Sequence, residues 1–337
     1  MKVPQKIIIS RTDSIGDVVL TLPMAGIIRK LYPAAEIIFL GSEYTRDIVG
    51  NCKHIDRFEA IEDFIELPEQ DKIKVLMSWE ADCFIHAFPI QALARLASLA
   101  KIRLRIGASG RVYHYIYCNK IVPLSRRRSQ LHESQLNLRL LKPLGAKNNY
   151  SIEEIGELFG FETMHIANPF TQSLKKDQFN LILHPKSKGS AREWGLNNFR
   201  QLIDILPRDR FNVYITGTSK EGELIKNEMP LFFKGVNDLT GKLSLKELIS
   251  FIQHADGLVA ASTGPLHIAA ISGKIAIGLY PPIRPMHPGR WAPIGNKATV
   301  LVADNECSEC RGTYSCRCLS AISPELVKIK LAQMIND

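Results

Sequence analysis

Residues 262–267, Ser-Thr-Gly-Pro-Leu-His, combine residue types that could hold an anion. Pro265 suits the start of a helix, so Thr263 and Gly264 would lie at that helix's N-terminus. The free N–H groups there, with the helix dipole, favour a negative charge, and a glycine lets the backbone approach it closely. The segment therefore predicts either an anion site or an ordinary helix cap.

A basic segment, residues 186–194 (KSKGSAREW), follows another apolar run. Lys186, Lys188 and Arg192 flank a glycine in a loop that opens a helix, which is a setting suited to phosphate oxygens. A Walker A motif is excluded, because no Gly-Lys-Ser/Thr follows that glycine. A solvated basic loop is the alternative. Paired with residues 262–267, the loop predicts the second side of a diphosphate site.

Two carboxylates, Asp13 and Asp17, lie in the polar segment 11–17 (RTDSIGD) after the first apolar run. The segment lacks the Gly-x-Gly-x-x-Gly pattern of dinucleotide-binding proteins. A carboxylate at this place could take a proton from a substrate hydroxyl. We favour Asp17 for this role, with Asp13 as its competitor, while capping a helix is the alternative role for Asp17.

These segments need a scaffold that brings them together, and the apolar patterns indicate one. Strand-like runs lie at 6–10, 35–41, 179–185, 211–217, 256–261 and 275–281. Runs with helical spacing lie at 18–32 and 196–206, each after one of the polar segments. This alternation predicts an α/β fold with two Rossmann-like domains facing across a cleft, with ligands at the carboxyl ends of the strands. We predict domains over 1–167 and 168–337, a linker at 168–178, and a final helix at 323–337 that could pack back on the first domain.

Charge is unevenly distributed along the chain, whose net charge is +9. Residues 36–82 carry twelve acidic and five basic side chains, whereas residues 83–150 carry twelve basic ones and a single acid, Glu133. The basic block favours an anionic partner such as a phosphorylated glycolipid or an acidic membrane surface, with a solvated basic face as the alternative. Nucleic acid is disfavoured, because RNA-recognition signatures are absent and Tyr113, Tyr115 and Tyr117 alternate as in a strand.

Apolar runs and cysteines limit the remaining classes. No run approaches the ~18 residues of a membrane span, and the start lacks a signal-peptide pattern, which predicts a cytoplasmic protein. A C-x2-C and a C-x-C pair could hold zinc, although their tight spacing favours free thiols. These four residues are Cys307, Cys310, Cys316 and Cys318.

Four segments together resemble glycosyltransferase family 9, the heptosyltransferases of bacterial lipopolysaccharide core synthesis and their relatives. They are SIGDVVLTLP (14–23), REWG (192–195), STGPLHIAAISGK (262–274) and RPMHPGRWAPIG (284–295), in this order over nearly the whole chain. The resemblance implies a GT-B fold, with the acceptor on the N-terminal domain and the sugar nucleotide on the C-terminal domain. It also implies inverting transfer without a catalytic metal or other cofactor.

The resemblance assigns roles to individual residues. Asp17 matches the proposed catalytic base, and Arg192 stands where the family has a basic residue on the donor phosphates. Ser262 replaces an aspartate thought to touch the donor sugar, which leaves the sugar open. The donor-binding residues predicted in this way are Lys188, Arg192, Glu221, Leu243, Ser262, Thr263, Gly264 and His267. The predicted acceptor-binding residues are Asp13, Arg105, Arg126, Arg127 and Arg128.

We therefore predict an inverting transferase that moves heptose or a related sugar from a nucleotide-diphosphate donor, with an ADP-sugar favoured. The acceptor would be lipopolysaccharide core or a similar anionic glycolipid. The protein would act in the cytoplasm, peripheral to the inner membrane, with no nucleic-acid partner. Two rival functions stay open: a UDP-sugar epimerase, and a degenerate transferase that binds nucleotide or glycolipid without turnover.

Overall fold

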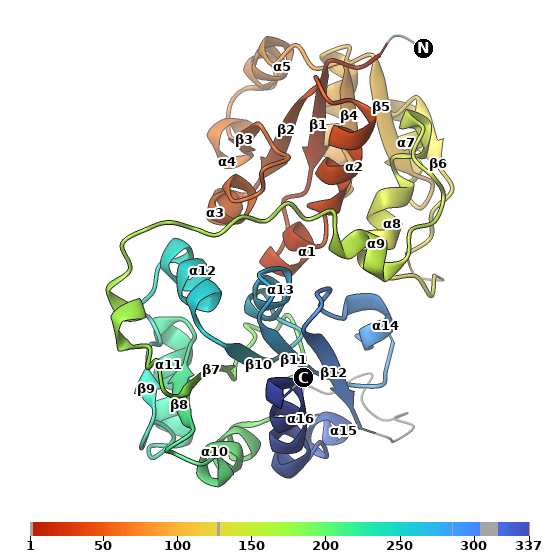
Figure 1. Cartoon of the computed structure of the whole chain (residues 1–337). Coiled ribbons are helices and arrows are strands. Elements are labelled where there is room, and N and C mark those ends of the chain that lie inside the picture. The colour runs from red at the N-terminus through yellow and green to blue at the C-terminus, as the bar shows by residue number, and fades with distance from the viewer. Residues whose placement is uncertain (1–2, 127–128, 285, 304–315, 337) are drawn as a thin grey trace. The chain divides into compact units, whose positions relative to one another are not determined.

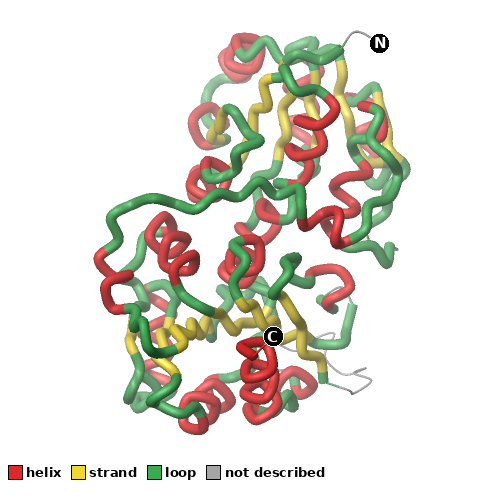
Figure 2. The backbone as a smooth tube through the Cα atoms, viewed as in Figure 1, coloured by secondary structure: helices red, strands yellow, loops and turns green. Residues whose placement is uncertain are grey.

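The computed structural model describes residues 3–126, 129–284, 286–303 and 316–336. The chain divides into two compact units, Met1–Glu162 and Thr163–Asp337, so the division falls five residues before the predicted boundary. Each unit contains one six-stranded sheet whose described strand pairs are all parallel, with helices packed around it (Figures 1 and 2). Among the described helices, none is both long enough and apolar enough to cross a bilayer.

The first unit has the strand order β3-β2-β1-β4-β5-β6. Its strands are β1 Lys6–Ser10, β2 Glu36–Gly41, β3 Arg57–Ala60, β4 Cys83–His86, β5 Leu104–Ala108 and β6 Lys120–Val122. Its helices are α1 Ile15–Val19, α2 Pro23–Leu31, α3 Arg46–Gly50, α4 Glu62–Ile65, α5 Glu69–Ser78, α6 Gln91–Leu99, α7 Val112–Tyr117, α8 Glu133–Arg139 and α9 Ile152–Gly156, with short 3-10 turns η1 Glu43–Thr45 and η2 Lys142–Leu144. The strand order reverses between β1 and β4, and ligands bind in sheets of this kind beyond that point.

The second unit repeats this topology with the order β12-β11-β10-β7-β8-β9. Its strands are β7 Phe179–His184, β8 Phe211–Ile215, β9 Asn237–Asp238, β10 Gly257–Ala261, β11 Ile275–Tyr280 and β12 Ala298–Val302. Its helices are α10 Leu196–Ile205, α11 Ser219–Glu228, α12 Leu245–His254, α13 Gly264–Ile271, α14 Pro288–Trp291, α15 Arg317–Ser320 and α16 Pro324–Asn336, with the 3-10 helix η3 Pro169–Ser173. Its order reverses between β7 and β10.

Local sequence explains why the first polar segment lies where it does. Ile7, Ile8 and Ile9 are all fully buried, because helices cover both faces of a parallel sheet and β1 must be apolar on each. The helix predicted over 18–32 is two helices, since α1 ends at Val19 and α2 begins at Pro23, whose ring cannot continue a preceding helix. Pro23 therefore marks the start of a helix.

One local prediction was wrong. The alternation of Tyr113, Tyr115 and Tyr117 indicated a strand, but these residues lie in helix α7. Only His114 of this helix is buried, and its Nδ1 lies 2.8 Å from the carbonyl oxygen of Ala108. A short helix with one buried position leaves no periodic apolar signal, so the spacing of the tyrosines misleads.

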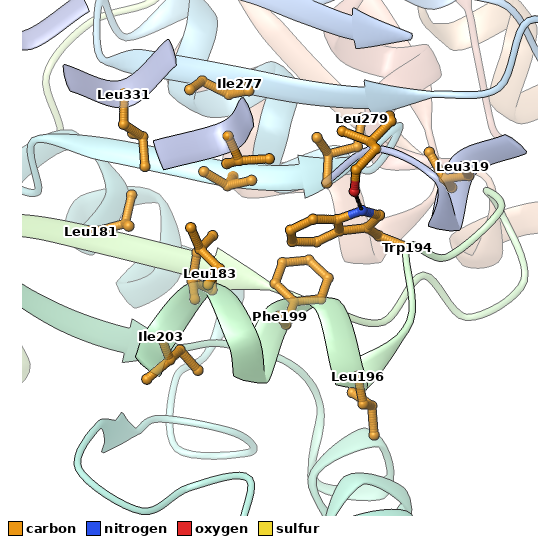
Figure 3. Close-up of a cluster of buried hydrophobic side chains, with 14 of the residues drawn as sticks. Leu181, Leu183, Trp194, Leu196, Phe199, Ile203, Ile277, Leu279, Leu319 and Leu331 are labelled. Atoms are coloured by element: carbon orange, nitrogen blue, oxygen red, sulfur yellow. Dashed lines mark hydrogen bonds between the residues drawn. The ribbon is translucent and has the colours of Figure 1, made fainter. Parts of the chain in front are cut away.

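The core of the second unit includes the final helix. Trp194 packs edge-on against Phe199 of α10 and donates its indole N–H to the Ile322 carbonyl oxygen at 2.8 Å (Figure 3). Leu331 of α16 belongs to the same buried cluster, and α16 packs on α10 and β11. The final helix is therefore part of the second unit's core.

The segment 168–178, predicted to be a linker between the domains, belongs to the second unit. Asn168 is buried, caps η3 through its side chain, and donates its amide to the Glu247 carbonyl oxygen at 2.9 Å. The Ser173 carbonyl accepts hydrogen bonds from Asn212 and Tyr214 of β8. Polar and proline-containing composition predicted flexibility here, but these hydrogen bonds fasten the segment to the second unit.

Candidate functional site

A buried arginine lies at the carboxyl end of the first unit's sheet. Arg11 follows β1 directly and is only 3% exposed. Its guanidinium pairs with Asp17 and, at 2.7 Å from Nε to Oδ1, with Asp13. Burial acts to lower the pKa of Arg11, but the neighbouring carboxylates outweigh it and leave that pKa raised. Arg11 is therefore a permanent positive charge that holds the two aspartates of the segment 11–17 in place.

A third carboxylate, Glu133, lies on the other side of Arg11. It opens α8, is 1% exposed, and accepts hydrogen bonds from Arg11 at 3.2 Å and from Arg126 at 2.9 Å. Asn137, one turn later, accepts from Arg126 at 2.8 Å. Among the described residues, two guanidinium groups thus contact three carboxylates.

Asp17 is the carboxylate held most firmly. It lies in the first turn of α1, where Ser14 Oγ donates to its Oδ2 at 2.5 Å while Arg11 pairs with its Oδ1. The Thr21 hydroxyl donates to its backbone carbonyl at 2.8 Å. Its side chain is still 20% exposed. Asp17 is therefore fixed in orientation and remains accessible to a substrate.

The pKa of Asp13 is strongly raised. Burial raises the pKa of Asp13 to about 6, a shift that Arg11 opposes and the charge of Asp17 reinforces. Ordinary aspartates titrate near 4, so Asp13 changes charge in a pH range where most carboxylates stay ionised.

Replacing Asp13 by asparagine tests this shift. Because its folded pKa lies above the unfolded value, Asp13 contributes stability that is fully present below about pH 4 and is lost as pH rises through about 6. Relative to the unmodified protein, Asp13→Asn should therefore gain about 1 kcal/mol in free energy of unfolding between pH 5 and pH 7.5. Urea unfolding at both pH values measures the difference, and a difference independent of pH would contradict the assignment.

In the second unit, the loop after β7 is organised by Glu193. Its carboxylate accepts the Ser187 N–H at 3.0 Å and lies 3.3 Å from Lys186 Nζ. Lys186 also pairs with Glu228, so its charge is used within the protein. Lys188 is exposed, has a positive φ of 50°, and makes no ion pair with any residue the structure describes. Lys188 is therefore the lysine of this loop that is available to a ligand.

The loop after β10 lies next to it, because β7 and β10 are paired neighbours at the point where the strand order reverses. Thr263 is the N-cap of α13, which begins at Gly264, but its side chain makes no capping bond. Its Oγ1 is buried and has no hydrogen-bond partner within the described part of the chain. A buried hydroxyl without a partner is unusual, and a bound ligand or water accounts for it. This favours the anion site over the ordinary cap.

His184, the last residue of β7, adds a group that no sequence motif indicates. Its Nδ1 lies 2.9 Å from Thr216 Oγ1, and burial lowers the pKa of this histidine to about 4. It is therefore a neutral imidazole at neutral pH. The only feature of the sequence that could have indicated this residue is its place at the end of an apolar run, directly before Pro185.

The remaining predicted donor residues follow the carboxyl ends of neighbouring strands of the same sheet. Glu221 lies in the first turn of α11, where its carboxylate accepts the Thr218 N–H at 2.7 Å, so it caps that helix. Ser262 directly follows β10, and its hydroxyl acts to lower the pKa of the Tyr280 phenol, which burial raises. The sheet edge thus brings together the loops that carry Lys188, Arg192, Glu221, Leu243, Ser262, Thr263, Gly264 and His267.

The predicted acceptor-binding residues belong to the first unit, but those that the structure describes do not all lie at one place in it. Arg126 joins Asp13 in the cluster around Arg11. Arg105 lies near the amino end of β5, at the opposite edge, and donates to the Tyr117 carbonyl oxygen at 2.7 Å. Its position therefore contradicts a role in the same site, and its role is to hold the end of α7. Arg127 and Arg128 lie outside the described residues.

The predicted cysteine site falls only partly within the described residues. Cys307 and Cys310 lie outside them, whereas Cys316 and Cys318 are buried in the second unit's apolar core. Over the described ranges, no group of three or more His, Cys, Asp or Glu side chains is arranged to hold a metal ion.

Comparisons with known proteins agree with this architecture. Residues 74–318 match the family described as glycosyltransferase family 9 (heptosyltransferase). The lipopolysaccharide core heptosyltransferase OpsX of Haemophilus influenzae is 22% identical over 309 residues, covering 88% of this chain and 84% of that protein.

Two solved structures are similar over nearly their whole length. The Escherichia coli ADP-heptose lipopolysaccharide heptosyltransferase II has a TM-score of 0.75 at 18% identity, covering 98% of both chains. The family 9 glycosyltransferase of Veillonella parvula has a TM-score of 0.78 at 18% identity, covering 98% of this chain and 97% of its own. At this identity the similarity establishes the fold, and the predicted GT-B class with two Rossmann-like units is confirmed.

Proposed function

We propose a donor, an acceptor and a mechanism for this chain, which belongs to glycosyltransferase family 9. It is a glycosyltransferase related to the lipopolysaccharide heptosyltransferases. The proposed reaction moves heptose or a related sugar from an ADP-activated donor to lipopolysaccharide core or a similar anionic glycolipid. A solved structure of the same fold is named for ADP-heptose, which supports this donor. The proposed location is the cytoplasm, against the inner membrane.

The observation that carries the proposal is the fixed carboxylate of Asp17. In the proposed mechanism, Asp17 takes the proton of the acceptor hydroxyl, while Arg11 and Ser14 hold its two oxygens. The acceptor oxygen then bonds to the anomeric carbon from the face opposite the diphosphate, and the bond from that carbon to the diphosphate oxygen breaks. The nucleoside diphosphate leaves with the electron pair, so the configuration at the carbon is inverted.

On the donor side, charge builds on the diphosphate as it leaves. The N–H groups at the start of α13 and the Thr263 hydroxyl would hold its oxygens, with Lys188 and Arg192 supplying positive charge. Preorganised donors of this kind stabilise developing charge strongly, because they need no reorientation during the reaction. We therefore propose that transfer requires neither a metal ion nor another cofactor.

Incubation with ADP-heptose and a lipopolysaccharide core acceptor tests the proposal. We expect free ADP and an acceptor heavier by one heptose, detected by mass spectrometry, both with and without EDTA. UDP- and GDP-sugars in parallel establish the base preference. Donor binding without ADP release would indicate a non-catalytic binder and overturn the proposal, and loss of transfer in EDTA would overturn its metal-free part.

Thr263→Val tests the diphosphate site separately from the chemistry. Valine has the shape of threonine and removes only a hydroxyl that has no partner among the described residues, so the free energy of unfolding should stay within about 0.5 kcal/mol or rise. Affinity for ADP should fall roughly tenfold, because one hydrogen bond to a charged group is lost. Calorimetric titration with ADP measures this.

Thr45→Val is the matched control for that experiment, because Thr45 is a buried N-cap threonine of the first unit whose hydroxyl does have a partner, the Ser42 carbonyl oxygen at 2.7 Å. It should lower stability without the same effect on ADP affinity. Unchanged ADP affinity in Thr263→Val would remove this residue from the donor site.

A further inference from the structure

Helix α7 carries an apolar face that the protein leaves in solvent. Val112, Tyr115 and Ile116 are 81%, 61% and 69% exposed, respectively. Their i, i+3, i+4 spacing places them on one side of the helix, opposite the buried His114. Isolated exposed apolar side chains are common on soluble proteins, but three together on a six-residue helix form a contiguous patch. Such a patch indicates a partner that covers it.

Positive charge surrounds this patch. Arg111 is the N-cap of α7, and Lys120 follows its C-terminal end. Asn119 donates its side-chain amide to the Arg103 carbonyl at 2.8 Å, which ties that end of α7 to the loop carrying Lys101. Lys101, Arg111 and Lys120 are exposed, and none makes an ion pair within the described ranges of the chain.

Negative charge is missing from the same segment. Residues 83–150 contain one acidic residue, Glu133, and it is 1% exposed and bonded to Arg11 and Arg126. No carboxylate of this segment is therefore available to neutralise the cations around α7. The patch combines an apolar centre, a tyrosine and three exposed cations that make no ion pair with a described residue, which is the composition of helices that lie in the interface of an anionic membrane.

We propose that α7 docks the protein on an anionic lipid bilayer, with Val112, Tyr115 and Ile116 inserted among the headgroups and Lys101, Arg111 and Lys120 on the lipid phosphates. Nucleic acid would use the cations but would leave the aliphatic side chains in water, so the apolar centre favours lipid. The inference rests on the proposed function in one respect: a glycolipid acceptor is embedded in a membrane, so the enzyme must reach a bilayer to use it.

The position of α7 beside the first unit's sheet is compatible with docking on a membrane that carries the acceptor. It begins just after the carboxyl end of β5, which pairs with β4, which in turn pairs with β1 (Figure 1). Two strand spacings amount to about 10 Å, and the carboxyl end of β1 carries the segment with Asp17. Docking through α7 would therefore bring the acceptor-side edge of the first unit close to the bilayer.

Sedimentation with vesicles tests the proposal. The protein should bind vesicles of phosphatidylcholine with one-third phosphatidylglycerol, bind pure phosphatidylcholine far less, and be released by ~0.5 M salt. The triple variant Val112→Ser, Tyr115→Ser, Ile116→Ser should bind at least about tenfold more weakly. Arg111→Gln with Lys120→Gln should weaken binding roughly 30-fold. All five positions are exposed, so thermal unfolding should be nearly unchanged.

Met77→Ser is the control, because Met77 is 55% exposed on α5 in the acid-rich segment of the same unit. It should bind vesicles like the unmodified protein. The proposal is overturned if the unmodified protein ignores anionic vesicles, if the α7 variants bind as well as it does, or if RNA competes the protein off vesicles and binds the triple variant equally well.

Transfer assays separate this inference from the proposed function. On a water-soluble, delipidated acceptor, the α7 variants should be as active as the unmodified protein, whereas on acceptor embedded in vesicles they should be slower. If no protein transfers sugar to either acceptor, the proposed function fails while vesicle binding still decides the role of α7. If the α7 variants and the unmodified protein transfer sugar to the embedded acceptor at equal rates, docking through α7 is contradicted, whereas the proposed function is not.

Discussion

Replacing Asp17 by asparagine should lower kcat for sugar transfer by about 10²–10⁴-fold, because the acceptor hydroxyl loses the group that takes its proton. Asparagine has nearly the same size, its Oδ1 can still accept the hydrogen bond from Arg11, and its Nδ2 can donate to Ser14 Oγ, so the first turn of α1 should keep its shape. The donor lies on the other unit in the proposed mechanism. Affinity for ADP should therefore be unchanged.

Rates of ADP release and calorimetric titration with ADP measure these two quantities. Asp56→Asn is the matched control, because Asp56 also pairs with an arginine, Arg29, but precedes β3 at the amino edge of the sheet. It should retain near-normal kcat. A near-normal kcat in Asp17→Asn would show that another group is the base, and Asp13, whose pKa lies near 6, would be the next candidate.

The strand and helix pattern could be predicted because each unit is built from parallel strands buried on both faces. Runs such as KIIIS and FNLILH are mostly apolar and buried, and the segments that follow them are polar with glycine. In such sheets the loops that follow successive strands meet at one edge. The grouping of Lys188 with Thr263 follows from this rule, although 75 residues separate them in the chain.

The charged cluster of the first unit could not be predicted in this way. Arg11 and Glu133 are 122 residues apart, and Glu133 looks like the one acidic residue of a basic surface until α8 buries it. Sequence patterns report burial of apolar side chains, whereas a buried ion pair leaves no periodic signal. The same limit explains the errors at α7 and at 168–178, where single hydrogen-bonded residues determine the structure.

Arg11→Met should destabilise the protein more than loss of any exposed charge. The side chain is almost fully buried between Asp13, Asp17 and Glu133, and methionine fills similar space without the charge. Removing one partner from a buried ion-pair cluster leaves uncompensated charge, which costs about 3–5 kcal/mol. Arg126 would remain as the single cation of the described cluster, bonded to Glu133.

The pH dependence distinguishes this cause from a simple packing defect. Arg11 lowers the pKa of Asp13, so its removal should raise that pKa further above 6 and further above the unfolded value. The variant then takes up a proton on folding, and its deficit in free energy of unfolding should shrink as pH falls from 7.5 to 5.5. Urea unfolding at both pH values measures this. Arg95→Met removes an exposed partner of Glu69 and should cost under about 1 kcal/mol at either pH. An equal deficit at both pH values in Arg11→Met would mean that lost packing, and not uncompensated charge, destabilises the fold.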